Sequence, residues 1–271
     1  MDYMHAAVLG LIQALTEFLP VSSSAHLLVL PWIFQWRSFG LFFDVALHWG
    51  TALAVLFYFR EEWTAMLLDL WQVIRHLPHI SSGWSSRLLP ILVLGTLPAV
   101  LLGLIGKKMI EQDLRQPWIA AFSLVLFGLL LVAADRLMPV RRRLQDIGLP
   151  DGVWIGLAQA LALIPGVSRS GITLTMGRCR CMERGDAARF SFLLSTPAIF
   201  GAAVLESWDF WKTPLEQHSA LGPALLGMVV AAVAGFACLH YFLRFLRHTG
   251  LEVFALYRIF LAAVIWFRYH S

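Results

Sequence analysis

The sequence has few charged residues and few cysteines for its length. Asp, Glu, Lys and Arg make up 14% of the 271 residues, against about 25% in soluble domains. Cys179, Cys181 and Cys238 match neither a zinc site nor a disulfide framework, so we expect three reduced, structural thiols. A net charge of +4 gives no indication of nucleic-acid binding. The composition therefore excludes a soluble globular domain, a disulfide-stabilised domain and a nucleic-acid-binding protein.

Hydrophobic residues account for 59% of the chain and gather in long runs. A spanning helix needs roughly 17–25 apolar residues, and six stretches approach that length: 41–59, 88–105, 118–134, 188–205, 221–243 and 251–267. Two further runs, 6–15 and 153–164, are too short to span and indicate re-entrant segments. We expect the first run to belong to the mature fold rather than to a signal peptide, because Asp2 precedes it and Glu17 interrupts it.

Two stretches of the chain are near-copies of each other. Residues 10–26 read GLIQALTEFLPVSSSAH, and residues 156–172 read GLAQALALIPGVSRSGI. They align without a gap, and each is a short apolar run that stops at a proline and opens into serines. Paired, interrupted apolar segments in the two halves of a membrane protein indicate a binding site. A weaker similarity, which ordinary small-residue packing explains equally well, links four glycines: Gly95 and Gly103 with Gly227 and Gly235.

The distribution of basic residues predicts the orientation of the chain. With both short runs re-entrant, one set of loops holds six Lys and Arg residues and the other holds thirteen. The positive-inside rule places the richer set in the cytoplasm and both termini outside. Three spans and one hairpin in each half make the two repeats inverted. The arginine run at 141–143 is most simply a topology determinant, with binding of anionic lipid as the alternative.

We therefore expect an all-α polytopic membrane protein with six spanning helices and two re-entrant helical hairpins in two inverted repeats. Residues 1–137 form the first inverted repeat and residues 152–271 the second. A basic cytoplasmic linker, residues 138–151, joins them.

The first copy carries an acidic residue where apolar residues are expected. Gln13 and Glu17 are four residues apart, so a helix places both on one face. Glu17 could bind a hard divalent cation such as Mg²⁺ or Ca²⁺, with Gln13 beside it, or it could pair with Arg169 without metal. Asp44 and His48, also four apart, either support this site or mark the membrane interface.

Serines and a histidine follow the acidic residue. The helix should end near Pro20, which leaves Ser22, Ser23 and Ser24 in a turn whose free backbone N–H groups can hold an anion. His26 comes directly after them. This pattern suits either a hydroxyl activated by an adjacent base or a histidine that attacks phosphorus itself.

The second copy supplies a cation. Arg169 offers a planar fork of donors that fits phosphate oxygens, and Ser168 and Ser170 flank it. Gly166 and Gly171 allow unusual backbone angles and close approach. An acid, a cation, hydroxyls and a base together are typical of phosphoryl transfer, in which catalysis is largely positioning and charge stabilisation.

Four segments resemble the undecaprenyl-diphosphate phosphatase family of the bacitracin-resistance type. They read LIQALTEFLPVSSSAHLL, FFDVALHWGTALAV, ALIPGVSRSGIT and AARFSFLLSTPAI. The resemblance implies removal of the terminal phosphate of a membrane-bound isoprenoid diphosphate lipid, which yields the monophosphate carrier of cell-wall precursors. It also implies that Ser23 or His26 takes part in the chemical step, that Glu17 acts with a divalent cation, and that Arg169 binds the diphosphate. The expected location is the bacterial inner (plasma) membrane, with the site facing the periplasm.

The chain departs from this family at two places. Gln13 stands where many members have Glu, which lowers the negative charge at any metal site. Arg178 and Arg180 flank Cys179, and we expect them at the cytoplasmic boundary without effect on the chemistry. The competing function is a transporter or flippase of a phosphorylated isoprenoid lipid, since inverted repeats with broken segments are also typical of transporters. A homo-oligomer is compatible with either function.

Overall fold

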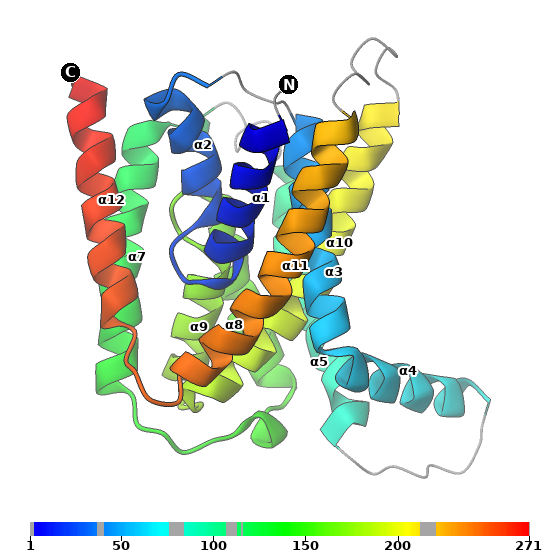
Figure 1. The fold of residues 1–271 in the computed structure, drawn as a ribbon. Coiled ribbons are helices and arrows are strands. Elements are labelled where there is room, and N and C mark those ends of the chain that lie inside the picture. Colours follow the sequence, from blue (N-terminus) through cyan, green and yellow to red (C-terminus); the bar gives the residue numbers. More distant parts are fainter. Residues whose placement is uncertain are drawn as a thin grey trace.

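The computed structural model describes residues 3–36, 41–75, 84–106, 113–114, 116–211 and 221–270. Six long helices correspond to the six predicted apolar stretches: α3 (Leu41–Tyr58), α5 (Trp84–Ile105), α7 (Pro117–Leu137), α10 (Arg184–Trp211), α11 (Leu221–Phe245) and α12 (Glu252–His270). They run between the upper and lower ends of the molecule in Figure 1. The expectation of an all-helical protein is confirmed for the described residues.

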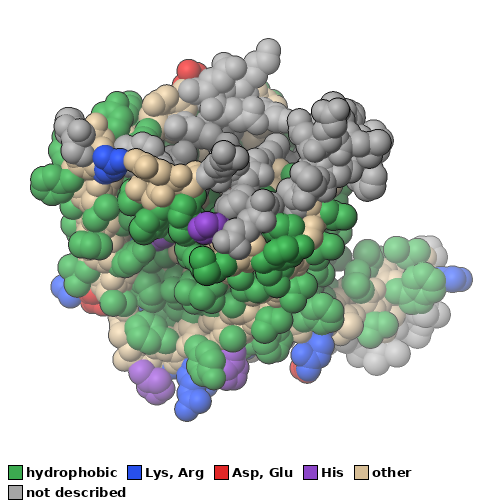
Figure 2. All heavy atoms as spheres, turned by 45° about the horizontal axis from the view of Figure 1, so that its top comes forward, with side chains coloured by type: hydrophobic (Ala, Val, Ile, Leu, Met, Phe, Trp, Pro, Cys, Tyr) green, Lys and Arg blue, Asp and Glu red, His purple; other side chains and the backbone are tan. Residues whose placement is uncertain are grey.

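The helices are apolar enough for a membrane protein. By length and composition, α7, α11 and residues Arg87–Ile105 of α5 could each cross a membrane. Helix α3 and the following α4 (Arg60–Ile74) form a bent pair, at 76°, that qualifies as a fourth candidate. Hydrophobic side chains cover much of the described surface in Figure 2, and Lys and Arg side chains lie mainly at its edges. The chain is thus a multi-pass membrane protein.

Each near-copy folds into a helical hairpin. The first consists of α1 (Tyr3–Phe18) and α2 (Ser23–Ile33), and the second of α8 (Leu149–Ala160) and α9 (Arg169–Cys179). In Figure 1 the first hairpin occupies the upper half of the molecule and the second the lower half, with their connecting turns near the middle. Helix α1 ends two residues before Pro20, as the sequence predicts.

The two hairpin turns have the same local structure. Ser22 caps α2 and Ser168 caps α9, with φ angles of 75° and 69°. The Ser22 hydroxyl accepts a hydrogen bond from the Ala25 N–H at 3.4 Å, and the Ser168 hydroxyl accepts one from the Gly171 N–H at 3.2 Å. A side-chain cap of this kind satisfies one of the free N–H groups of the first helical turn. The duplication seen in the sequence is therefore also present in the backbone.

Glycines allow both hairpins to approach their neighbouring helices closely. A Cβ atom on Gly10 would lie 2.5 Å from the carbonyl oxygen of Gly227 in α11. A Cβ atom on Gly156 would lie 2.3 Å from the carbonyl oxygen of Gly95 in α5. Two glycine pairs that are equivalent in the sequence alignment thus make equivalent contacts, as small residues do at membrane helix interfaces.

Ion pairs join the linker to the second hairpin at the lower end of the molecule. Arg142 and Arg180 contact the buried Asp151 carboxylate, with each closest N–O distance at 2.7 Å. Arg178 is fully buried, and its Nε lies 3.2 Å from Asp135 Oδ1. Arg178 and Arg180 therefore lie with the linker and act in packing, and their place at the cytoplasmic boundary stays a prediction.

Candidate active site

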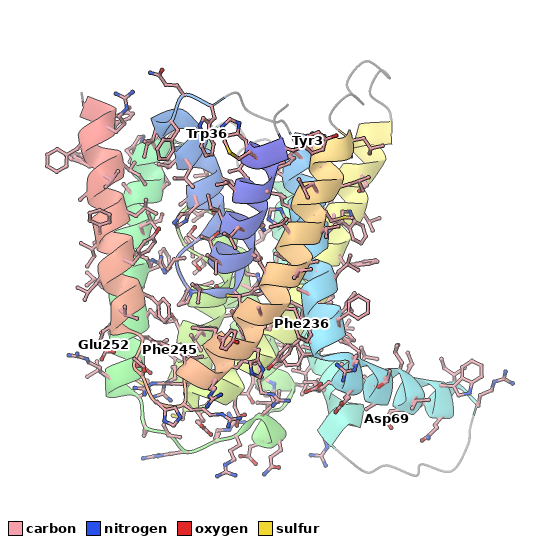
Figure 3. The ribbon with its side chains drawn as sticks, viewed as in Figure 1. Tyr3, Trp36, Asp69, Phe236, Phe245 and Glu252 are labelled. Atoms are coloured by element: carbon pink, nitrogen blue, oxygen red, sulfur yellow. The ribbon has the colours of Figure 1, made fainter. Side chains whose placement is uncertain are left out.

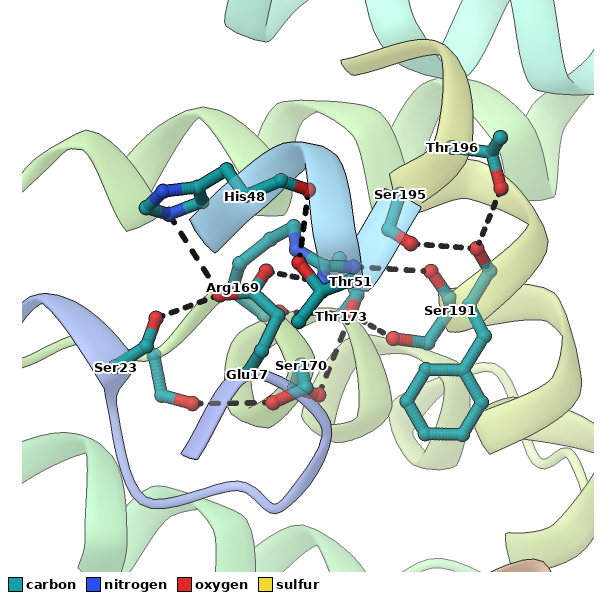
Figure 4. A network of polar contacts seen from close by, with 12 residues as sticks. Glu17, Ser23, His48, Thr51, Arg169, Ser170, Thr173, Ser191, Ser195 and Thr196 are labelled. Atoms are coloured by element: carbon teal, nitrogen blue, oxygen red, sulfur yellow. Dashed lines mark hydrogen bonds and ion pairs between the residues drawn. The ribbon is translucent and has the colours of Figure 1, made fainter. Parts of the chain in front are cut away.

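Glu17 lies at the centre of a polar network that both hairpins supply (Figure 4). Its Oε1 accepts a hydrogen bond from Arg169 Nη2 at 2.8 Å, and its Oε2 accepts one from the Ser23 hydroxyl at 2.7 Å. Gln13 Nε2 also donates to Oε2, at 3.2 Å. Glu17 is only 7% exposed, so its charge requires these partners. The structure thus brings together four of the predicted site residues.

Arg169 is held from a second direction by α10. Its Nη1 donates to the backbone oxygen of Ser191 at 3.4 Å, and its own carbonyl accepts from the Thr173 hydroxyl at 2.8 Å. The hydroxyls of Thr173 and Ser191 are 2.5 Å apart. Thr173 and Ser191 were not predicted from the sequence, although both fall in segments that carry the family resemblance. These contacts hold Arg169 beside Glu17.

The other predicted serines shape the turns. The Ser22 and Ser24 hydroxyls are 3.1 Å apart, and those of Ser168 and Ser170 are 3.3 Å apart. Ser170 also donates to the backbone oxygen of Leu19 at 3.1 Å, which ties the second hairpin to the first. Ser22, Ser168 and Ser170 are buried, whereas Ser24 is exposed. Their predicted contact with substrate stays a prediction.

Gly171 is surrounded by side chains of the second turn. A Cβ atom at this position would lie 3.0 Å from Arg258 Nη1 and 3.2 Å from the Ser168 hydroxyl oxygen. Gly171 therefore allows close packing, and its predicted role in substrate binding stays a prediction.

His26 makes its hydrogen bonds away from this centre. Its Nδ1 is 2.7 Å from the Ser22 carbonyl oxygen, and its Nε2 is 2.7 Å from the Tyr257 hydroxyl. Because a carbonyl can only accept, Nδ1 carries a hydrogen, and in the neutral ring Nε2 then accepts from Tyr257. The two rings stack at a centroid distance of 5.6 Å. Tyr257 belongs to α12 and was not anticipated, since an aromatic residue in an apolar run gives no signal of its own.

A different histidine lies beside the carboxylate. His48 Nε2 is 3.9 Å from Glu17 Oε2, and His48 Nδ1 donates to the backbone oxygen of Asp44 at 2.7 Å. The sequence left two alternatives for His48, support of the site or a place at the membrane interface. Its position agrees with support of the site. The described contacts therefore place His48, and not His26, next to Glu17.

Arg258 is the main residue that sequence reasoning missed. It is 0% exposed, and its guanidinium donates to backbone carbonyls on three sides. Nη1 reaches Pro20 O in the first turn at 3.4 Å, while Nη2 reaches Gly166 O at 2.8 Å and Val167 O at 3.0 Å in the second. Nε and Nη2 donate to carbonyls of α7 at 3.0 and 3.4 Å. One side chain of α12 thus joins both hairpin turns.

The site offers oxygen atoms that suit a hard cation. Gln13 Oε1 is buried and has no hydrogen-bond partner among the described residues. It belongs to the residue next to the Glu17 carboxylate, and carboxylate, amide and hydroxyl oxygens are the ligands that Mg²⁺ and Ca²⁺ prefer. Within the described ranges, no group of three His, Cys, Asp or Glu side chains could hold a metal ion. A cation here would need further oxygens from a substrate, so the predicted metal site stays a prediction.

Known proteins resemble the chain over nearly its whole length. A family model described as bacitracin resistance protein BacA matches residues 6–264. An undecaprenyl-diphosphatase from Moorella thermoacetica is 44% identical over 98% of this chain and 97% of its own. One from Nitrosococcus oceani is 44% identical, covering 98% of this chain and 99% of its own. A protein named undecaprenyl-diphosphatase 2, from Stutzerimonas stutzeri, is 42% identical over 98% and 97% of the two chains.

Proposed function

The chain belongs to the family of bacitracin resistance protein BacA, and on that basis we propose that it is an undecaprenyl-diphosphate phosphatase. It removes the terminal phosphate of undecaprenyl diphosphate and returns undecaprenyl phosphate, the carrier of cell-wall precursors. This recycling confers resistance to bacitracin. Within the site, the observation that supports this reaction is the contact of one buried carboxylate, Glu17, with both a hydroxyl and a guanidinium.

The site residues have separate roles in this proposal. Arg169 moves from Glu17 to the diphosphate when substrate binds, because phosphate oxygens match its planar fork of donors. Glu17 is then free to accept the proton of Ser23, whose hydroxyl already points at it. His26 is assigned a positioning role, since both of its ring nitrogens are hydrogen-bonded elsewhere.

The reaction proceeds through a covalent intermediate on Ser23. The Ser23 oxygen attacks the terminal phosphorus while its proton passes to Glu17, and the bond from that phosphorus to the bridging oxygen breaks. The lipid monophosphate departs. Water then attacks the phosphoserine, Glu17 returns the proton to the departing Ser23 oxygen, and inorganic phosphate leaves with the oxygen and protons of the water.

Release of inorganic phosphate from undecaprenyl diphosphate by purified protein in detergent tests the function. Wild-type protein should release phosphate, and Ser23→Ala should not. If wild-type protein released none but still bound the lipid, a transporter or flippase would be the better assignment. The inverted hairpins are compatible with that second function.

We also propose that Gln13 and Glu17 hold a divalent cation together with substrate oxygens. The bound cation would neutralise charge on the diphosphate. Hydrolysis is therefore expected to vanish in excess chelator and to return when Mg²⁺ or Ca²⁺ is added. Glu17→Gln should lose both turnover and metal response, whereas Gln13→Glu should keep activity and bind the metal more tightly. If the wild-type enzyme stays fully active in chelator, the proposed metal site is wrong. Glu17 then acts only through its contacts with Ser23 and Arg169.

The finer topology is the third part of the proposal: six spans and two re-entrant hairpins, with the site open to the periplasm. The unequal distribution of Lys and Arg supports it. In spheroplasts that express a cysteine-free background, an impermeant thiol reagent should label Ser271→Cys but not Arg141→Cys. After lysis both positions should react. Labelling of position 141 from outside would overturn this orientation.

A further inference from the structure

A cavity of about 690 Å³ lies at the end of the molecule that carries the basic linker. It lies where the C-terminal end of α11 meets the beginning of α10 and the end of α3. Four arginines and two carboxylates line it: Arg143, Arg189, Arg244, Arg247, Glu183 and Asp186. His240 and His248 line it as well. Since arginines outnumber carboxylates, the cavity favours an anion.

Two acidic residues near the cavity are already engaged, and one arginine donor is not. Asp186 accepts a hydrogen bond from the Leu144 N–H at 3.0 Å. Glu62 receives a close hydrogen bond from Arg189 Nη2. Arg189 Nε is buried and has no hydrogen-bond partner among the described residues. A buried donor without a partner is rare in folded proteins, so this N–H is available to a ligand that enters the cavity.

Apolar side chains near the cavity favour a lipid over a free anion as its ligand. Tyr58 lines the cavity and packs against Phe236 of α11, with ring centroids 5.4 Å apart. Phe236 is 43% exposed, and Figure 3 shows it on the lower half of α11, above Phe245. A headgroup in the cavity would therefore leave its acyl chains beside exposed apolar side chains of α3 and α11.

We propose that this cavity binds the phosphate of an anionic phospholipid headgroup. Arginine fits phosphate oxygens through parallel N–H donors. Basic pockets between membrane helices on the cytoplasmic side are known to bind such headgroups. The site is separate from the Glu17 centre, because none of its lining residues belongs to that centre. The inference therefore does not depend on the phosphatase activity.

Lipid binding by the purified full-length protein tests the proposal. The test variant is Arg244→Gln with Arg247→Gln, both of which line the cavity. Phosphatidylglycerol retained by the protein is titrated by native mass spectrometry, with phosphatidylcholine as the neutral comparison. Loss of two arginines should weaken phosphatidylglycerol binding roughly 30-fold. Arg244→Lys with Arg247→Lys keeps the charge and should retain most of the binding.

A control variant separates the cavity from general surface charge. Arg60→Gln with Arg75→Gln removes the same charge at the two ends of α4, outside the cavity lining, and should leave phosphatidylglycerol binding unchanged. An equal loss in test and control variants would overturn the proposal. The proposal would also be overturned if inorganic phosphate saturated the cavity while phosphatidylglycerol failed to compete, since the ligand would then be a free anion. Saturation would be measured as a rise in Tm that depends on the arginines.

Discussion

Replacing Arg169 with Lys is expected to lower kcat for undecaprenyl diphosphate hydrolysis roughly 100-fold or more, a loss similar to that of one transition-state donor in other enzymes. Lysine keeps the positive charge that Glu17 requires, so the protein should still fold. It cannot reproduce the fork of donors, one arm of which lies 2.8 Å from Glu17 and the other 3.4 Å from the Ser191 carbonyl. Phosphate release at saturating lipid, with detergent-solubilised enzyme of normal expression, measures the effect.

Arg180→Lys is the matched control for this variant. Arg180 directly follows the same helix, α9, but contacts Asp151 in the linker region at 2.7 Å, away from Glu17. It should keep near-wild-type turnover. Near-wild-type kcat in the Arg169→Lys enzyme would remove Arg169 from the proposed contact with the diphosphate.

Replacing Arg258 with Met should cost at least about 3 kcal/mol of folding free energy and abolish turnover. Methionine fills part of the volume but leaves buried carbonyls of both hairpin turns without a donor, and each such group costs about 1–3 kcal/mol. The turns would also lose the side chain that joins Pro20 to Gly166 and Val167. The measurements are Tm in detergent and kcat on the folded fraction.

Arg136→Met provides the comparison for Arg258. Arg136 pairs with Glu252 at 2.9 Å, but its side chain is 66% exposed, and exposed pairs contribute little. Tm and kcat should change little. Arg258→Lys should lie between wild type and Arg258→Met, because an ammonium can serve fewer of the carbonyls. If Arg258→Met kept both Tm and kcat, the turns would be held together by other contacts.

Local patterns in the sequence predicted the hairpins well. A proline followed by serines ends a helix, and a serine caps the next one, whatever the rest of the chain does. The grouping of Glu17, Ser23 and Arg169 followed from the near-identity of the two copies. The six long helices followed from apolar runs, which need no knowledge of their neighbours.

Residues that act through distant partners could not be predicted in this way. His26 and His48 have similar settings in the sequence, and only the packing of α3 and α12 decides which one lies beside Glu17. Arg258 looks like a single basic residue in an apolar run, and its acceptors are carbonyls, which every residue has. Helix α4 matches no predicted segment, because Glu61, Glu62 and Asp69 interrupt its apolar character.

Ser23 and Arg169 occupy the same place in the two copies, as the first residues of α2 and α9. A symmetric dimer of one half-chain could therefore offer two serines or two arginines at these positions, but never one of each. In a single chain that carries both copies, each position can differ from its counterpart. The serine and the arginine that contact Glu17 thus have different roles, which two identical copies could not supply.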